Sequence, residues 1–163
     1  MKERISQINA GDSWQKKIAV LIEHQRLRSF PVLLQEFLTT LCFYDTFIMV
    51  TYKKSLRPIL IYPTNPEEQS STLRKYLNHA FVLDPLSHSI KSGIAPGVVR
   101  LVDIMPDSFK ETEYFNTCYK DFGLVDEINL IIHLDEKVTC TLTLGRKASL
   151  DSISRLLTIS IRF

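Results

Sequence analysis

Apolar residues near the N-terminus recur at intervals of three and four, which places them on one face of a helix. Two segments show this spacing, and the second begins near Pro31, a residue suited to the first turn of a helix. The apolar positions are Trp14, Ile18, Leu21, Ile22 and Leu27 in the first segment, and Leu33, Leu34, Phe37, Leu38 and Leu41 in the second. We therefore predict two amphipathic helices.

The pattern then changes to short runs of β-branched and aromatic residues. Residues 45–52 and 57–62 have this character, and the polar stretch 53–56 lies between them. Such runs separated by a few polar residues are typical of paired strands. We predict an antiparallel hairpin here.

Helix-start signals follow. Asn65 as N-cap with Glu68 three residues later forms a capping-box pattern, which predicts a helix. A second, shorter helix is predicted after Asp84 and Pro85, ending at Gly93.

The C-terminal half contains the clearest hairpin. Residues 97–104 predict a short strand, and an aromatic helix is expected from Pro106 to Gly123. Strands over 125–134 and 138–146 then flank the turn 135–137. In the last strand Thr139, Thr141 and Thr143 alternate with Val138, Cys140, Leu142 and Leu144. This alternation predicts one buried face and one face toward water or a cavity.

A last helix is expected near Ser149, after the second hairpin. Five predicted strands, joined partly by tight hairpins, and interspersed helices indicate an α+β fold with a mostly antiparallel sheet. A chain of 163 residues without a recognisable linker is most simply one domain, so we assign residues 1–163 to a single domain.

The composition narrows the class of protein. No apolar run approaches the roughly 20 residues that span a bilayer, and the first residues lack the apolar core of a secretory signal. We therefore expect a cytoplasmic protein. Cys42, Cys118 and Cys140 are far apart and lack metal-ligand spacing, which favours free thiols.

Charge is distributed unevenly although the net charge is only +2. Residues 100–136 hold three basic and nine acidic side chains. An acidic middle region is a poor surface for phosphate groups, so direct nucleic-acid binding by this region is not expected.

Known catalytic motifs are missing from the sequence. It contains no phosphate-binding loop, dinucleotide fingerprint, HExxH or GxSxG. Asp126 and Glu127 are adjacent in a predicted strand, so their side chains point to opposite faces and cannot act together as an acid–base pair. We predict no enzyme activity, no cofactor and no metal site.

Tyrosines are the remaining candidates for chemistry. A tyrosine combines a large apolar ring with one polar group, and several around a cavity, with a carboxylate, make a small-molecule site. The alternative is that each is an ordinary core residue. The candidate ligand-binding residues are Tyr52, Tyr62, Tyr76, Asp84, Tyr114 and Asp126.

An ordered set of short motifs over residues 76–146 resembles the N-terminal sensor region of bacterial LuxR-type transcriptional regulators. The motifs are Asp84-Pro85, Pro96-Gly97, Leu101 to Asp103, Pro106 to Phe109, Glu113 to Phe115, and Gly123 to Glu127. The resemblance implies a GAF/PAS-like domain, with a central antiparallel sheet and helices on both faces. In related acyl-homoserine-lactone receptors, a tyrosine and an aspartate at the positions of Tyr76 and Asp84 contact the ligand.

Two features depart from that family pattern. The receptors use pocket tryptophans, whereas Trp14 is the only tryptophan here and lies near the N-terminus, so the resemblance leaves the ligand unidentified. Regulators of this type also carry a C-terminal helix-turn-helix domain, which this sequence does not contain. The resemblance implies a homodimer that reaches DNA only through such a module.

Two other functions stay open at this point. The first is a ligand-free protein–protein interaction domain whose cavity is filled by its own tyrosines. The second is a thiol-based reductase of the GAF type, which would need a cysteine with a low pKa.

Overall fold

The computed structural model describes residues 11–53, 57–63 and 70–148. The chain divides into two compact units, residues 1–44 and residues 45–163, and each is described by itself. No helix among the described residues is long and apolar enough to cross a bilayer.

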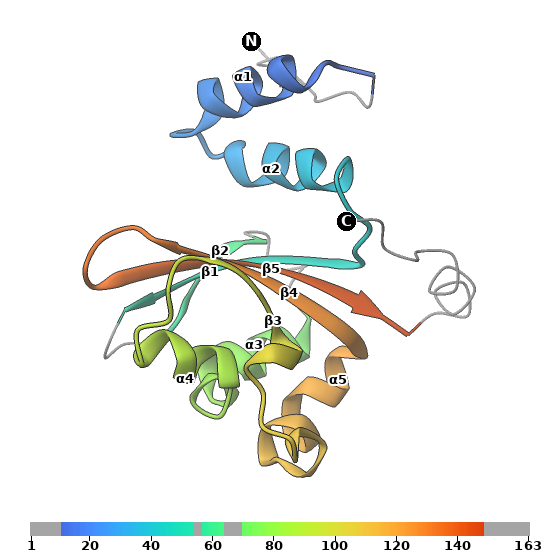
Figure 1. Ribbon diagram of the computed structural model, residues 1–163, viewed down its shortest axis with the longest axis vertical. Helices are drawn as coiled ribbons and strands as arrows, with labels where there is room; N and C mark the ends of the chain where they lie inside the picture. Colours follow the sequence, from blue (N-terminus) through green and yellow to red (C-terminus); the bar gives the residue numbers. More distant parts are fainter. Residues whose placement is uncertain (1–10, 54–56, 64–69, 149–163) are drawn as a thin grey trace. The chain divides into compact units, whose positions relative to one another are not determined.

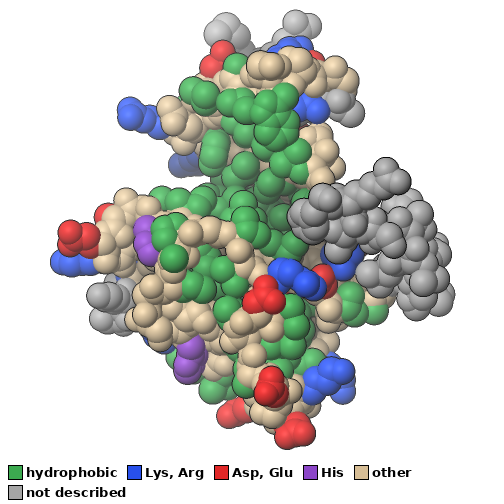
Figure 2. All heavy atoms as spheres, viewed as in Figure 1, with side chains coloured by type: hydrophobic (Ala, Val, Ile, Leu, Met, Phe, Trp, Pro, Cys, Tyr) green, Lys and Arg blue, Asp and Glu red, His purple; other side chains and the backbone are tan. Residues whose placement is uncertain are grey.

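The first unit contains two helices, α1 (Trp14–His24) and α2 (Phe30–Thr39). The Ser13 side chain caps α1 by accepting a hydrogen bond from the backbone of Lys16. Leu33 and Phe37 of α2 form the buried centre of this unit, and the ring of Phe37 lies 5.0 Å from that of Trp14. Hydrophobic side chains gather on these helices in Figure 2. Both helices were predicted from the apolar spacing.

The second unit is built on a five-stranded antiparallel sheet (Figure 1). Its strands follow the spatial order β2-β1-β5-β4-β3. They are β1 (Thr46–Lys53), β2 (Ile59–Tyr62), β3 (Gly97–Arg100), β4 (Leu124–His133) and β5 (Val138–Lys147). The predicted α+β class and all five predicted strands are confirmed.

Short helices cover one face of this sheet, as Figure 1 shows. They include α3 (Ser71–Asn78), α4 (Pro85–Lys91) and α5 (Lys120–Phe122). The buried core beneath them consists of Leu73, Tyr76, Ala80, Leu101, Phe109, Tyr114, Cys118 and Tyr119. The core is thus rich in aromatic rings, which bury a large apolar area each.

The predicted long helix after Pro106 is broken into shorter pieces. A 3₁₀ turn spans Phe109–Glu111, a π-helical segment spans Phe115–Tyr119, and α5 follows. Thr112 has an extended backbone (φ −68°, ψ 152°), and its hydroxyl accepts a hydrogen bond from the backbone of Phe115. A residue that caps a new helical segment cannot itself continue the preceding one, which explains the break. Gly123, with φ 67°, ends α5 as predicted.

The predicted strand over 97–104 is also shorter than expected. β3 ends at Arg100, and Leu101–Asp103 form a 3₁₀ turn that buries Leu101 in the core. The chain leaves the sheet edge because Leu101 packs under the helices instead of continuing the pairing with β4.

Two predicted features lie outside the described residues, namely the capping box at Asn65 and the last helix near Ser149. The helix predicted after Asn65 is observed from Ser71, with the Ser70 hydroxyl accepting from the backbone of Leu73 at 3.1 Å.

The two faces of β5 differ in chemistry, as its alternating sequence predicts. Cys140, Leu142 and Leu144 point to one face, and Thr141 and Thr143 point to the face covered by α3 and α4. The helix-covered face of the central strands is therefore partly polar. This arrangement places hydroxyl groups inside the domain.

Candidate functional site

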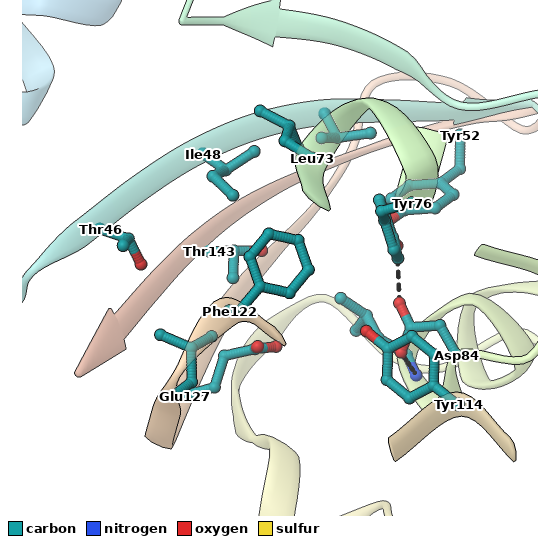
Figure 3. A pocket seen from close by; sticks show the side chains of 13 residues that line it. Thr46, Ile48, Tyr52, Leu73, Tyr76, Asp84, Tyr114, Phe122, Glu127 and Thr143 are labelled. Carbon is teal, nitrogen blue, oxygen red and sulfur yellow. Dashed lines mark hydrogen bonds between the residues drawn. The ribbon is translucent and has the colours of Figure 1, made fainter. Parts of the chain in front are cut away.

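A cavity of about 40 Å³ lies between the sheet and its covering helices (Figure 3). Strands β1, β4 and β5 form its floor, and residues of α3, α4, α5 and the segment before the π-helical turn form its walls. Its lining consists of Thr46, Ile48, Val50, Tyr52, Leu73, Tyr76, Asp84, Leu86, Tyr114, Phe122, Leu124, Glu127 and Thr143. The cavity thus combines aromatic walls with a few polar groups.

A chain of hydrogen bonds crosses one end of this cavity. The hydroxyl groups of Tyr52 and Tyr76 lie 2.7 Å apart, and the Tyr76 hydroxyl donates to Asp84 Oδ2 at 2.6 Å. Asp84 is also the N-cap of α4, since its Oδ1 accepts from the backbone of Leu86 at 2.8 Å. The Asp-Pro pair that starts α4 therefore also fixes the direction of this carboxylate.

A second polar network lies on the sheet. Glu127 Oε1 accepts a hydrogen bond from Asn129 Nδ2 at 2.8 Å, and Asn129 Oδ1 accepts from the Thr143 hydroxyl at 2.7 Å. Asn129 is fully buried, and Glu127 is 9% exposed. Because β4 and β5 pair Asn129 with Thr143, the register of the hairpin creates this network.

Burial changes the protonation of both carboxyl groups. Desolvation raises the pKa of Asp84 to about 6, although the hydrogen bond from Tyr76 opposes the shift. Desolvation, with the negative charge of Asp84 as a second cause, raises the pKa of Glu127 to about 8. At neutral pH Asp84 is mostly a carboxylate acceptor, whereas Glu127 is mostly a protonated carboxyl group that can also donate.

The lining contains no lysine, arginine or histidine. The tyrosines also stay neutral, because desolvation and then the charge of Asp84 raise the pKa of Tyr76 and Tyr114 well above its usual value. The Tyr114 hydroxyl makes no hydrogen bond with the described part of the chain. This arrangement suits neutral, hydrogen-bonding groups and disfavours an anion.

Four of the six residues predicted for a ligand site lie together on this cavity. They are Tyr52, Tyr76, Asp84 and Tyr114. Tyr62 instead packs against Phe47, with ring centres 5.5 Å apart, and does not line the cavity.

Asp126 is the second residue that lies elsewhere. Its carboxylate pairs with Arg146 at 2.9 Å and with Arg100 at 3.5 Å, on the face of β4 opposite Glu127. The adjacent acids therefore point to opposite faces, as the alternation predicts, but the inward-facing acid is Glu127.

Glu127, Asn129 and Thr143 were not selected from the sequence. The alternation in 125–134 indicates that one of the two acids faces inward, and it groups Glu127 with Asn129. The alternation alone does not show whether the face of this strand with Glu127 and Asn129, or the opposite face, lies toward the helices. A register irregularity between Leu124 and Asp126 sets the phase of the strand, and it depends on pairing with β5.

Other candidate chemistry gains no support. Within the described ranges, no three histidine, cysteine, aspartate or glutamate side chains are grouped to hold a metal ion. His88 Nε2 lies 2.6 Å from the Val82 carbonyl oxygen. Burial raises the pKa of Cys118 and of Cys140 to about 11.

Comparison with known proteins gives structural neighbours only. No protein-family model and no curated protein matches the chain. The crystal structure of the VqsR ligand-binding domain from Pseudomonas aeruginosa matches with a TM-score of 0.72 and 22% identity, over 91% of this chain and 90% of that one. SdiA in complex with octanoyl-rac-glycerol matches with a TM-score of 0.54 and 15% identity, over 93% of this chain and 64% of SdiA. The chain therefore has the fold of LuxR-type ligand-binding domains.

Proposed function

We propose that this chain is the small-molecule-sensing domain of a LuxR-type transcriptional regulator and that its ligand binds at the cavity under α3 and α4. The observation that carries the proposal is the convergence of two buried hydrogen-bond networks on one aromatic cavity. Asp84 belongs to the first network and Glu127 to the second. Buried polar groups converging on an apolar cavity are the usual form of a small-molecule site.

The ligand we propose is neutral and carries hydrogen-bond donors. The lining has two carboxyl groups and no basic side chain, so a donor on the ligand is better matched than an anion. SdiA, which shares the fold, is described with octanoyl-rac-glycerol, a neutral molecule with hydroxyl groups. That neighbour supports the class of ligand rather than its identity.

The regulatory part of the proposal follows from the family resemblance. Ligand binding would stabilise one conformer of a cytoplasmic, GAF/PAS-like homodimer and so change the placement of an attached helix-turn-helix module. A ligand shifts such an equilibrium only by its difference in affinity for the two conformers. DNA is then contacted by that module and not by the sensing domain.

The size of the cavity favours a second candidate, a ligand-free interaction domain. A cavity needs about 10–15 Å³ to hold one water molecule, so a cavity of about 40 Å³ holds only a few. Three tyrosines, Tyr52, Tyr76 and Tyr114, line this small cavity. A ligand of signal-molecule size requires these side chains to move.

A thiol-based reductase has less support. A nucleophilic cysteine needs a lowered pKa, whereas burial raises the pKa of Cys118, Cys140 and also Cys42.

Native mass spectrometry of freshly purified protein tests the proposal. A reproducible additional mass that is released on denaturation supports a ligand site, and its identity gives the ligand class. Asp84→Asn should abolish the additional mass, and Asp126→Asn, which alters a carboxylate on the other face, should retain it. Apo protein, combined with no thermal shift across a panel of neutral signal molecules, contradicts ligand sensing and supports the interaction domain.

A further inference from the structure

The first four residues of β4 lack a partner strand on one side. β3 pairs with residues 128–131 of β4 and ends at Arg100, opposite Ile128. Residues 124–127 therefore have a neighbouring strand on the β5 side only, within the described part of the chain. A strand edge without a partner presents N–H and C=O groups that can pair with another chain.

A groove of about 900 Å³ runs along this edge. Four consecutive residues of the strand line it, namely Leu124, Val125, Asp126 and Glu127. Successive side chains of a strand point to opposite faces, so a groove on one face would be lined by every second residue. Lining by all four places the groove at the edge of the strand, where the two faces and the backbone meet.

The backbone at this edge uses a local acceptor. The N–H group of Glu127 donates to Asp126 Oδ1 at 2.9 Å, within the same strand. A side chain that bonds a neighbouring N–H group in this way offers the backbone an alternative to a partner strand. A carbonyl group of an incoming chain can take the place of the Asp126 oxygen, because Asp126 Oδ2 remains paired with Arg146 at 2.9 Å.

The chain that follows β3 supplies the apolar part of the lining, which consists of Leu101, Phe109, Phe115 and Tyr119. Phe115 and Tyr119 begin and end the π-helical segment, and π-helical turns are frequent at functional sites. Tyr119 is 6% exposed, and its hydroxyl group makes no hydrogen bond with the described residues. The groove thus offers aromatic side chains and one hydroxyl group to a bound chain.

Charges of opposite sign lie at two places along the groove. On the face of β4 away from the helices, Arg100 and Arg146 share the single carboxylate of Asp126, which leaves one positive charge in excess. Residues 107–111 hold two exposed acids and one exposed lysine, which leaves one negative charge in excess. A segment with one acidic and one basic side chain matches both places.

We propose that this groove binds an extended peptide segment of a partner protein, which adds to the sheet as a strand beside residues 124–127. The backbone of the segment supplies affinity and its alternating side chains supply specificity. Apolar side chains of the segment face the aromatic side chains of the groove, an acidic side chain pairs with Arg100, and a basic side chain lies beside the acids of residues 107–111. Leu124 and Glu127 also line the cavity under α3 and α4, so the docked segment contacts two residues of that lining.

Fluorescence anisotropy of the whole chain with the labelled synthetic peptide VTLDVTK tests the inference. When extended, this peptide places its apolar and lysine side chains on one face and its aspartate on the other, which matches the groove. The peptide VTLKVTD has the same composition with the two charges exchanged. It should bind about five- to tenfold more weakly, because each charge then meets a like charge.

Methylation of the peptide backbone distinguishes strand addition from binding by side chains alone. The N–H groups of alternate residues point to the same edge of an extended peptide, so methyl groups on one alternate set block one edge and leave the other intact. One set should weaken binding by about tenfold or more, through loss of backbone hydrogen bonds, and the other set should leave it unchanged. Hydrogen exchange at residues 124–127 should slow when the unmodified peptide is bound.

Val102→Trp and Val98→Trp form a matched pair of variants. The two valines are 46% and 69% exposed, and of the two Val102 alone lines the groove. Val102→Trp should weaken binding of VTLDVTK by about tenfold by filling the groove, whereas Val98→Trp should bind it like wild type. Arg100→Glu, at a side chain that is 54% exposed, should reverse the preference between the two peptides and decides if Val102→Trp does not fold.

Each of four results would overturn the inference. They are no binding of VTLDVTK by wild type up to about 1 mM, equal affinity for the two peptides, equal effects of the two methylated sets, and equal effects of Val102→Trp and Val98→Trp. The proposed ligand sensing is tested separately by native mass spectrometry, because peptide docking does not require a ligand in the cavity.

Discussion

The hydroxyl group of Tyr76 donates a hydrogen bond of 2.6 Å to Asp84 Oδ2, which links α3 to the N-cap residue of α4 inside the domain. Both side chains are buried, at 7% and 4% exposure. One carboxylate therefore caps a helix, joins two helices and faces the cavity. Stability and ligand binding are expected to depend on the same contact.

Replacing Tyr76 with Phe removes this hydrogen bond and leaves one oxygen of a buried carboxylate without its donor. We expect a loss of about 1.5–3 kcal/mol in the free energy of unfolding, the usual range for a hydrogen bond to a charged group. Urea denaturation measures it. Tyr119→Phe is the control, since Tyr119 is equally buried but its hydroxyl makes no hydrogen bond with the described residues. Equal losses for both variants would show that the contact with Asp84 contributes little.

Glu127 should make the stability depend on pH. Its folded pKa of about 8 lies above the ordinary value of 4.5, so between these values the folded state binds a proton that the unfolded state has released. The contribution of this bound proton to the free energy of unfolding is therefore present in full below about pH 4.5 and is lost as pH rises through about pH 8. It amounts to about 1.4 kcal/mol per pKa unit at most.

Glu127→Gln should remove this dependence while keeping the acceptor for Asn129. Denaturation from about pH 5 to about pH 9 should show the variant gaining stability relative to wild type as pH rises. The exposed Glu23→Gln serves as control. A constant difference between wild type and Glu127→Gln across this range is the contrary result.

Gly145 in β5 allows a close approach of two cavity residues. A Cβ atom there would lie 2.5 Å from Thr46 Oγ1 and 2.8 Å from Leu124 Cδ2. Gly145→Ala should therefore destabilise the protein by about 1–3 kcal/mol through overpacking, and displaced Thr46 and Leu124 should also weaken ligand binding. Gly11→Ala is the control because no atom lies within 4 Å of its added Cβ. Thermal denaturation of both variants distinguishes a steric effect from a general effect of the substitution.

Asp126 and Glu127 should behave differently although they are neighbours. Asp126 is paired with arginines at a partly exposed position, with its side chain 21% exposed and that of Arg146 30% exposed. Such pairs contribute about 1 kcal/mol or less. Asp126→Asn should therefore change stability only slightly and leave ligand binding unchanged, as titration with the identified ligand will show. A reduced ligand affinity of this variant would show that Asp126 does belong to the ligand site.

The three cysteines should differ in reactivity. Cys42 is exposed, whereas Cys118 and Cys140 are buried with a pKa raised to about 11. A thiol-reactive chromogenic disulfide should modify one thiol quickly and the other two only after denaturation. Cys42→Ser should abolish the fast phase. Rapid modification of Cys118 or Cys140 in the folded protein would instead reopen the reductase hypothesis.

Local patterns in the sequence determined the secondary structure to a large extent. The strand alternation around Thr141 and Thr143, the capping residue Asp84 and the helix-ending Gly123 all act through contacts within a few residues. The break at Thr112 was missed because the apolar spacing continues through it, and only the extended backbone at that residue ends the first segment.

The tertiary structure decided which side chains meet. Tyr52, Tyr76, Asp84 and Tyr114 come from four different segments, and their convergence depends on the order in which the strands pair. Tyr62 has the same residue type as these tyrosines but pairs opposite Met49, which places it on the other face of β1 and β2.

Alternation along a strand determined by itself that Asp126 and Glu127 face opposite ways, because successive side chains of extended backbone point to opposite sides. Only the pairing of β4 with β5, and the helices that cover one face, decided that Glu127 is the buried acid. The size of the cavity could likewise not be predicted from the sequence, since it depends on how side chains from distant segments pack together.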